Sequence, residues 1–170
     1  ETDTTGRDFV ANETVLHGDI DNNGDTSGNA YHVLISAGAV GSAELDGFTV
    51  AKGNANISIS TPENSVNSVF ASRSAGGGMI NVSSTPLIGN CTFINNYAAN
   101  GGGIGNYFSS PVISTCIIAG NSSSIDGGGV YNVYNSAIID NCIFSGNMGR
   151  FGGGLCNYYS ANWQPIRNGL

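Results

Sequence analysis

The chain has 170 residues, of which 40% are apolar and 26 are glycine, a composition that suits one folded domain and excludes a disordered chain. Only 10% of the residues are charged, the net charge is −7, and the five basic residues form no cluster, which excludes a nucleic-acid surface. No apolar run is long enough to cross a bilayer, so we expect no membrane insertion.

Residues 1–30 are predicted to form an irregular coil with a short strand at 14–16 and an Asp-rich turn. The turn places oxygen-bearing side chains at alternate positions, namely Asp19, Asp21, Asn23 and Asp25. Together with Gly24 this resembles the first half of an EF-hand loop, although position twelve is Ala30 rather than glutamate. The segment therefore predicts either a Ca²⁺ site, the one cofactor that we expect, or a plain exposed turn.

The next part of the chain contains two apolar runs, residues 31–35 and 45–50, that are predicted to be strands. The second run resembles a segment that recurs later in the chain. Residues 55–75 contain Pro62 and are too long for a single corner, so we expect a coil that carries a protruding loop there.

Residues 76–160 contain a regular repeat marked by four glycine triplets. The triplets begin at Gly76, Gly101, Gly127 and Gly152, so they are 25, 26 and 25 residues apart. Each is followed by one apolar residue and, two positions later, by an asparagine. The apolar runs between the triplets are too short for helices and predict strands. A constant period of this kind predicts coils that stack into a single-domain parallel β-solenoid over residues 1–170.

Three cysteines occupy one position of the repeat, and acids are rare within it. Cys91, Cys116 and Cys142 should therefore form a column of core thiols rather than a metal site. The alternative, a disulfide between adjacent coils, is compatible with their spacing but would be strained. The isolated acids Asp126 and Asp140 do not form a carboxylate pair, so we predict no catalytic residue.

Aromatic side chains gather just after the glycine triplets in the last three coils. Such a strip could stack on sugar rings, or it could only fill and cover the coils. The candidate sugar-binding residues are Tyr107, Tyr131, Tyr134, Tyr158, Tyr159 and Trp163.

The triplets and the Phe-x-x-Asn segments, such as Phe93 to Asn96 and Phe144 to Asn147, resemble the repeats of bacterial polymorphic outer membrane proteins. They also resemble the wider set of secreted bacterial proteins with a pectin-lyase-like fold. The resemblance implies an all-β, right-handed, single-stranded parallel β-helix with about 25 residues per coil and five to six coils. It also implies an extracellular or cell-surface location.

Two functions follow from these features. The first is a non-catalytic, extracellular or cell-surface β-solenoid with a structural, adhesive or filament-forming role, in which copies associate end to end. The alternative is a carbohydrate-binding or polysaccharide-degrading segment of pectin-lyase-like type, whose partner would be a polysaccharide.

Overall fold

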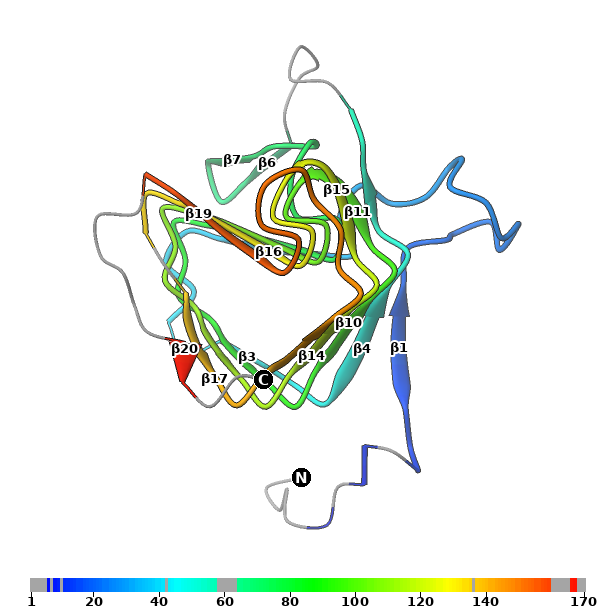
Figure 1. Cartoon of the computed structure of the whole chain (residues 1–170), viewed down its shortest axis with the longest axis horizontal. Helices are drawn as coiled ribbons and strands as arrows, with labels where there is room; N and C mark the ends of the chain where they lie inside the picture. The colour runs from blue at the N-terminus through cyan, green and yellow to red at the C-terminus, as the bar shows by residue number, and fades with distance from the viewer. Residues whose placement is uncertain are drawn as a thin grey trace.

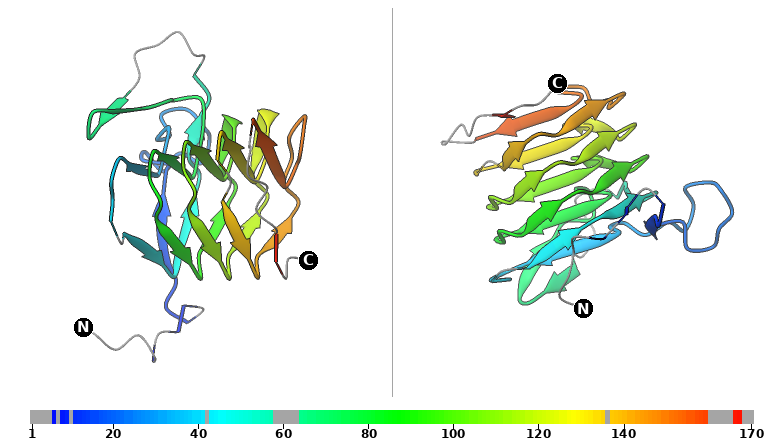
Figure 2. Two further views of the ribbon diagram at one scale, coloured as in Figure 1. Left: turned by 90° about the vertical axis from the view of Figure 1, so that its left-hand side faces the viewer. Right: turned by 90° about the horizontal axis from the view of Figure 1, so that it is seen from below.

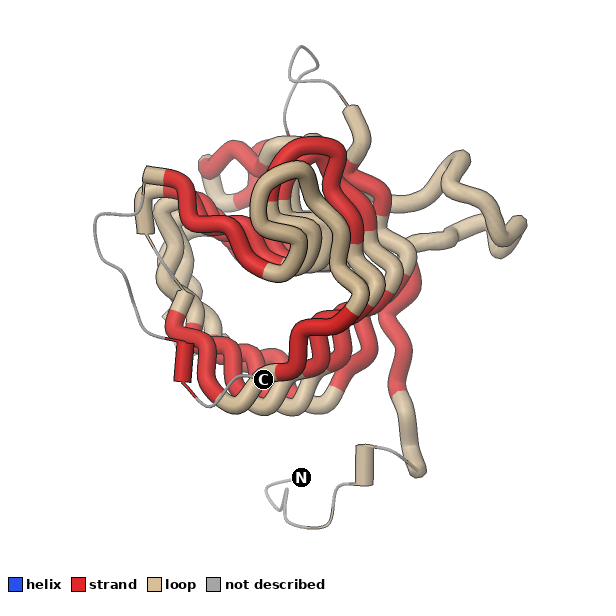
Figure 3. The backbone as a smooth tube through the Cα atoms, viewed as in Figure 1, coloured by secondary structure: helices blue, strands red, loops and turns tan. Residues whose placement is uncertain are grey.

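The computed structural model describes residues 6, 8–9, 11–41, 43–57, 64–135, 137–159 and 166–167. Within these residues the regular elements are all β-strands, and none is a helix (Figure 1, Figure 3). The predicted all-β class is therefore confirmed for the described part of the chain.

Most strands belong to four parallel sheets, in which they lie in the following spatial order. Sheet 1 contains β1 (Thr14–His17), β4 (Phe48–Ala51), β10 (Thr92–Ile94), β14 (Ile117–Ala119) and β18 (Ile143–Ser145). Sheet 2 contains β2 (Leu34–Ala37), β8 (Met79–Val82), β12 (Ile104–Tyr107), β16 (Val130–Val133) and β19 (Leu155–Tyr158). Sheet 3 contains β3 (Glu44–Asp46), β9 (Leu87–Gly89), β13 (Val112–Ser114), β17 (Ile138–Asp140) and β20 (Ile166–Arg167). Sheet 4 contains β5 (Asn54–Ala55), β11 (Tyr97–Asn100) and β15 (Ser122–Asp126).

From β8 onward the chain returns to each sheet after 25–27 residues, so neighbouring strands are one repeat apart in the sequence. Before β8 the spacing is longer: β2, β3 and β4 lie 43–45 residues before their partners β8, β9 and β10. Phe93 of β10 lies beside Ile118 of β14, which lies beside Phe144 of β18. Figure 2 shows the strands of each sheet stacked in successive layers along one direction. The period read from the glycine triplets is therefore the register of the sheets.

The core lies between sheets 1, 2 and 3, where each strand points alternate side chains inward. In sheet 1 the inward column contains Val50, Phe93 and Ile118, each fully buried. Sheets 2 and 3 add columns of isoleucine, valine and methionine to the same cluster. Because the inward side chains contact those of the turns above and below, the apolar core is continuous along the stack.

Two columns of buried asparagine run along the stack beside this apolar core. In sheet 2, the amide of Asn81 donates to Asn106 (2.8 Å), Asn106 donates to Asn132 (2.7 Å), and Asn132 donates to Asn157 (2.7 Å). At the corner after sheet 1, Asn96 donates to Asn121 (3.0 Å) in the same way. Buried amides need such partners, so the repeat of asparagine in the sequence is a repeat of hydrogen bonds in the structure.

The glycine triplets lie at corners of the chain, where the backbone conformation and the close approach of the next turn both require glycine. The first glycine of each triplet has a positive φ; for Gly101 it is 64°. A Cβ on the second glycine of that triplet, Gly102, would lie 2.2 Å from the carbonyl oxygen of Ser122 in the next turn. Turns of the chain pass closely enough here that no side chain fits.

The first third of the chain departs from this pattern. The strand predicted at residues 31–35 begins instead at Leu34 and continues to Ala37. Within the segment expected to protrude, β6 (Asn64–Val66) and β7 (Val69–Ala71) form an antiparallel hairpin that contacts β2 and β8. Residues 58–63 of that segment lie outside the described residues.

Candidate functional site

The predicted Asp-rich turn is a loop over residues 19–29 that leaves sheet 1 after β1 and returns to the stack. Its base is held by two main-chain hydrogen bonds: Gly18 donates to Ala51 (2.8 Å), and Ala30 donates to Gly18 (2.8 Å). The amide of Asn54 also reaches the loop and donates to the carbonyl of Thr26 (2.9 Å). In Figure 1 the loop projects from the side of the stack beyond the end of β1.

The four candidate calcium ligands have different roles within this loop. The side chains of Asn23 and Asp25 accept the main-chain amides of Asp25 (2.9 Å) and Ser27 (2.6 Å), which is how such residues form turns. Hydrogen bonds from Ser27 also lower the pKa of Asp25. Asp21 accepts a hydrogen bond from the side-chain amide of Asn23 (3.0 Å). Asp19 is buried, and its Oδ2 accepts the amide of Gly24 (3.2 Å).

The arrangement of acids is sparse. In the described ranges no three His, Cys, Asp or Glu side chains converge in a manner that could hold a metal ion. A cation in the Asp-rich loop would therefore also need amide and carbonyl oxygens, which are ordinary ligands of calcium but not of zinc.

The aromatic strip consists of two rows on the side of the stack formed by sheet 2. In one row Tyr131 lies between Tyr107 (6.0 Å between ring centroids) and Tyr158 (6.3 Å). Tyr131 is only 6% exposed, and burial raises the pKa of both Tyr107 and Tyr131. Most of this row therefore packs between neighbouring strands of sheet 2.

The second row, Phe108, Tyr134 and Tyr159, is exposed. Phe108 and Tyr134 stack with centroids 4.4 Å apart and an interplanar angle of 13°, and Tyr134 and Tyr159 stack at 6.1 Å and 10°. Each residue directly follows a strand of sheet 2, and each has a positive φ. Because neighbouring rings cover one another's faces, the row presents ring edges and hydroxyl groups along its length. Trp163, the last predicted member of the strip, lies outside the described residues.

The three repeat cysteines form the buried column that the sequence predicts. Cys91, Cys116 and Cys142 are each 1% exposed, and all are free thiols. Cys116 and Cys142 each donate to the carbonyl oxygen two residues earlier, at 3.2 Å in both cases. Hydrogen bonds with its two neighbours, together with burial, raise the pKa of Cys116, so its thiol is protonated and unreactive near neutral pH.

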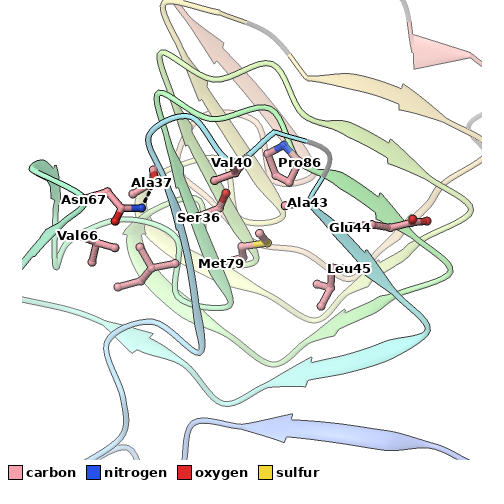
Figure 4. Close-up of a pocket in the computed structure, with 11 residues that line it drawn as sticks. Ser36, Ala37, Val40, Ala43, Glu44, Leu45, Val66, Asn67, Met79 and Pro86 are labelled. Carbon is pink, nitrogen blue, oxygen red and sulfur yellow. Dashed lines mark hydrogen bonds between the residues drawn. The ribbon is translucent and has the colours of Figure 1, made fainter. Parts of the chain in front are cut away.

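A cavity of about 230 Å³ lies at the end of the stack where β2 and β3 are edge strands (Figure 4). It is lined mainly by apolar side chains, including Val40, Leu45 and Met79. Asn67 of the β6–β7 hairpin closes one side by donating to the carbonyl of Ala37 (3.1 Å). Glu44 is the one ionisable residue among those that line it, so the cavity contains no pair of groups for acid–base chemistry.

The part of the chain that the structure describes contains no helix that could span a membrane. Comparison with known proteins identifies no relative. No protein-family model, no curated protein and no solved structure matches this chain.

Proposed function

We propose that the chain is a right-handed parallel β-helix with about 25 residues per coil and a non-catalytic structural or adhesive role outside the cell or at its surface. The observation that carries this proposal is the pair of buried asparagine columns, which repeat in register with the parallel strands. Hydrogen bonds of this kind join one coil to the next and give a stiff stack whose outer surface can vary.

The outer surface supports an adhesive role. On the outward side of sheet 3, Leu87 and Ile138 are 44% and 38% exposed, and Val112 lies between them in register. On sheet 1, Ile117 and Ile143 are neighbours and are 43% and 52% exposed. Contiguous exposed apolar side chains are typical of surfaces that contact another macromolecule.

The experiment that tests the structural proposal is duplication of one coil. Insertion of a second copy of residues 104–129, a 26-residue unit, between Gly129 and Val130 should give a protein that folds and melts in one cooperative transition. Its melting temperature should be equal to or higher than that of the parent chain, because the longer stack contains one more contact between neighbouring coils. A duplicated chain that does not fold would contradict the proposal.

A matched control keeps the length and composition of the insertion but breaks its pattern. The same 26 residues inserted in scrambled order would not place apolar side chains and asparagine at the inward positions of the new coil. It should be much less stable than the in-register duplication.

The non-catalytic role has its own test. Incubation of the parent chain with a panel of polysaccharides should release no new reducing ends or unsaturated products, and turnover of any of them would overturn the non-catalytic role.

Carbohydrate binding is a second candidate, favoured by the exposure of Tyr134, Tyr158 and Tyr159, which are 48%, 46% and 69% exposed. These three side chains would contact a glycan through hydroxyl groups and ring edges. A glycan array should distinguish the two roles: binding that is lost in Tyr134→Ala and Tyr159→Ala would favour the second candidate. End-to-end association of copies remains a prediction from the sequence.

A further inference from the structure

Two buried oxygen atoms in the Asp-rich loop have no hydrogen-bond donor. One is Oδ1 of Asp19, a residue that is 8% exposed, and the other is Oδ1 of Asn29, a residue that is 9% exposed. A buried acceptor without a partner costs free energy, and a carboxylate oxygen costs more than an amide oxygen. Both atoms belong to residues at the base of the same loop, so one bound species could compensate both.

The remaining contacts of these two side chains show how they are held. Asp19 uses Oδ2 to accept the amide of Gly24 (3.2 Å), which directs its carboxylate across the inside of the loop. Asn29 donates its amide to the carbonyl of Lys52 (2.9 Å), so its oxygen is the atom left over. In each residue one polar atom orients the side chain and the other is free to bind.

Asp21 brings a second carboxylate to this part of the loop. A Cβ built on Gly28 would lie 3.2 Å from Oδ2 of Asp21, so this carboxylate reaches across to the residue that precedes Asn29. The loop contains three acids and no basic residue between positions 19 and 29. The free atoms at the base of the loop are therefore acceptors in a region of negative charge.

The geometry points to a site for a hard divalent cation, Ca²⁺, built from Asp19, Asp21 and Asn29 with main-chain carbonyls and water. Carboxylate and amide oxygens are the ligands that Ca²⁺ prefers. This set differs from the alternate-position pattern of the sequence: Asn23 and Asp25 form the turns that shape the loop, and Asn29 enters as a ligand. With two carboxylates the affinity should resemble that of weak extracellular sites, with a Kd of about 10⁻⁴–10⁻³ M.

The test is isothermal titration calorimetry of the whole chain with CaCl₂ after treatment with a chelator, together with thermal melts up to about 10 mM CaCl₂. The parent chain should bind one Ca²⁺ and show a higher melting temperature with it. Asp19→Asn keeps an acceptor for the Gly24 amide but removes the charge, and it should weaken binding at least about 10-fold. Asp21→Asn should also weaken binding, whereas Asp25→Asn, the matched control, should stay within about 3-fold of the parent.

Three results would overturn the site. One is a folded parent chain that gives neither heat nor a shift in melting temperature with CaCl₂. Another is an Asp25→Asn variant that loses as much affinity as Asp19→Asn. The third is an equal stabilisation by MgCl₂, which would indicate ionic screening. Circular dichroism without calcium must show Asp19→Asn folded; if it is not, Asp21→Asn against Asp25→Asn decides the same question.

Discussion

The regular turns over residues 76–159 and the turns before them use the same sheets but satisfy their polar groups differently. In the regular part, each buried asparagine bonds to the asparagine one turn away. In sheet 2 of the first turn the same column position is Ser36, which bonds instead to Ser84 of a neighbouring loop (3.0 Å). Buried polar atoms without partners occur in both parts: in Asp19, Asn29 and His32 of the first, and in Asn81, Ser123 and Asp126 of the regular part.

This difference shows what a repeat contributes to stability. Where the residues recur, the same hydrogen bond between asparagine side chains satisfies the buried amide group in each repeat. Where they do not, each loop needs its own hydrogen bonds, such as the one between Ser36 and Ser84. The asparagine columns therefore stabilise the regular part of the stack, and the first part depends on contacts that occur once.

The largest expected effect comes from the glycine triplets. Gly102→Ala would place a Cβ 2.2 Å from a main-chain oxygen of the next turn, which only a shift of the backbone can relieve. We expect a loss of about 4 kcal/mol or more in the free energy of unfolding. In the irregular loop, Gly24→Ala meets no atom within 4 Å but has a φ of +80°, so it should cost only about 1 kcal/mol. Urea unfolding of both variants measures the difference, and equal losses would contradict this view of the corners.

The second largest loss of stability is expected from substitutions in the asparagine columns. Asn106→Leu keeps the approximate volume of a fully buried side chain but leaves the amide of Asn81 without its acceptor, which should cost about 3 kcal/mol. Ser36→Ala, at the same column position in the first turn, should cost about 1 kcal/mol. If Asn106→Leu were as mild as Ser36→Ala in chemical denaturation, the column would not be what stabilises the regular coils.

A smaller effect is expected in the pH dependence of the free energy of unfolding, to which His32 of the first turn contributes. Burial lowers the pKa of His32, whose Nδ1 lies 3.0 Å from the carbonyl oxygen of Gly76. Because the unfolded chain then takes up a proton more readily than the folded chain, this contribution to stability is complete above about pH 6.5 and is lost as the pH falls. Stability measured from pH 8 to pH 5 should decline in the parent and decline less in His32→Asn. The exposed His17, changed to Gln, should leave the decline as it is.

The smallest effect concerns the exposed aromatic row. Tyr134→Ala removes a stacked, half-exposed ring and should cost about 1 kcal/mol. Tyr134→Gly removes the same ring but also relieves a φ of 67°, so it should be no less stable than the alanine variant. Thermal melts of the two variants give the comparison, and a glycine variant that is clearly the weaker would mean that the backbone there is not strained.

The sequence predicts the repeating strands well because glycine and asparagine are each required at a fixed point of every repeat. Gly102 has no room for a side chain, and Asn106 has no buried partner other than another asparagine, so both leave a visible period. The β6–β7 hairpin leaves no such period, since it occurs once in the chain. Asn29 could not be identified either, because the loop brings it into contact with the main chain of Lys52, 23 residues away.

The central claim is that residues one repeat apart lie in adjacent strands of a parallel stack. Nitroxide labels at Leu87→Cys and Ile138→Cys, on the outward side of sheet 3, test it most directly in a Cys156→Ser background. These residues are two strands apart in the structure, so the labels should be about 10 Å apart and should broaden each other's electron paramagnetic resonance spectra strongly. A doubly labelled, folded protein whose spectrum equals the sum of the two single-label spectra would contradict the stack.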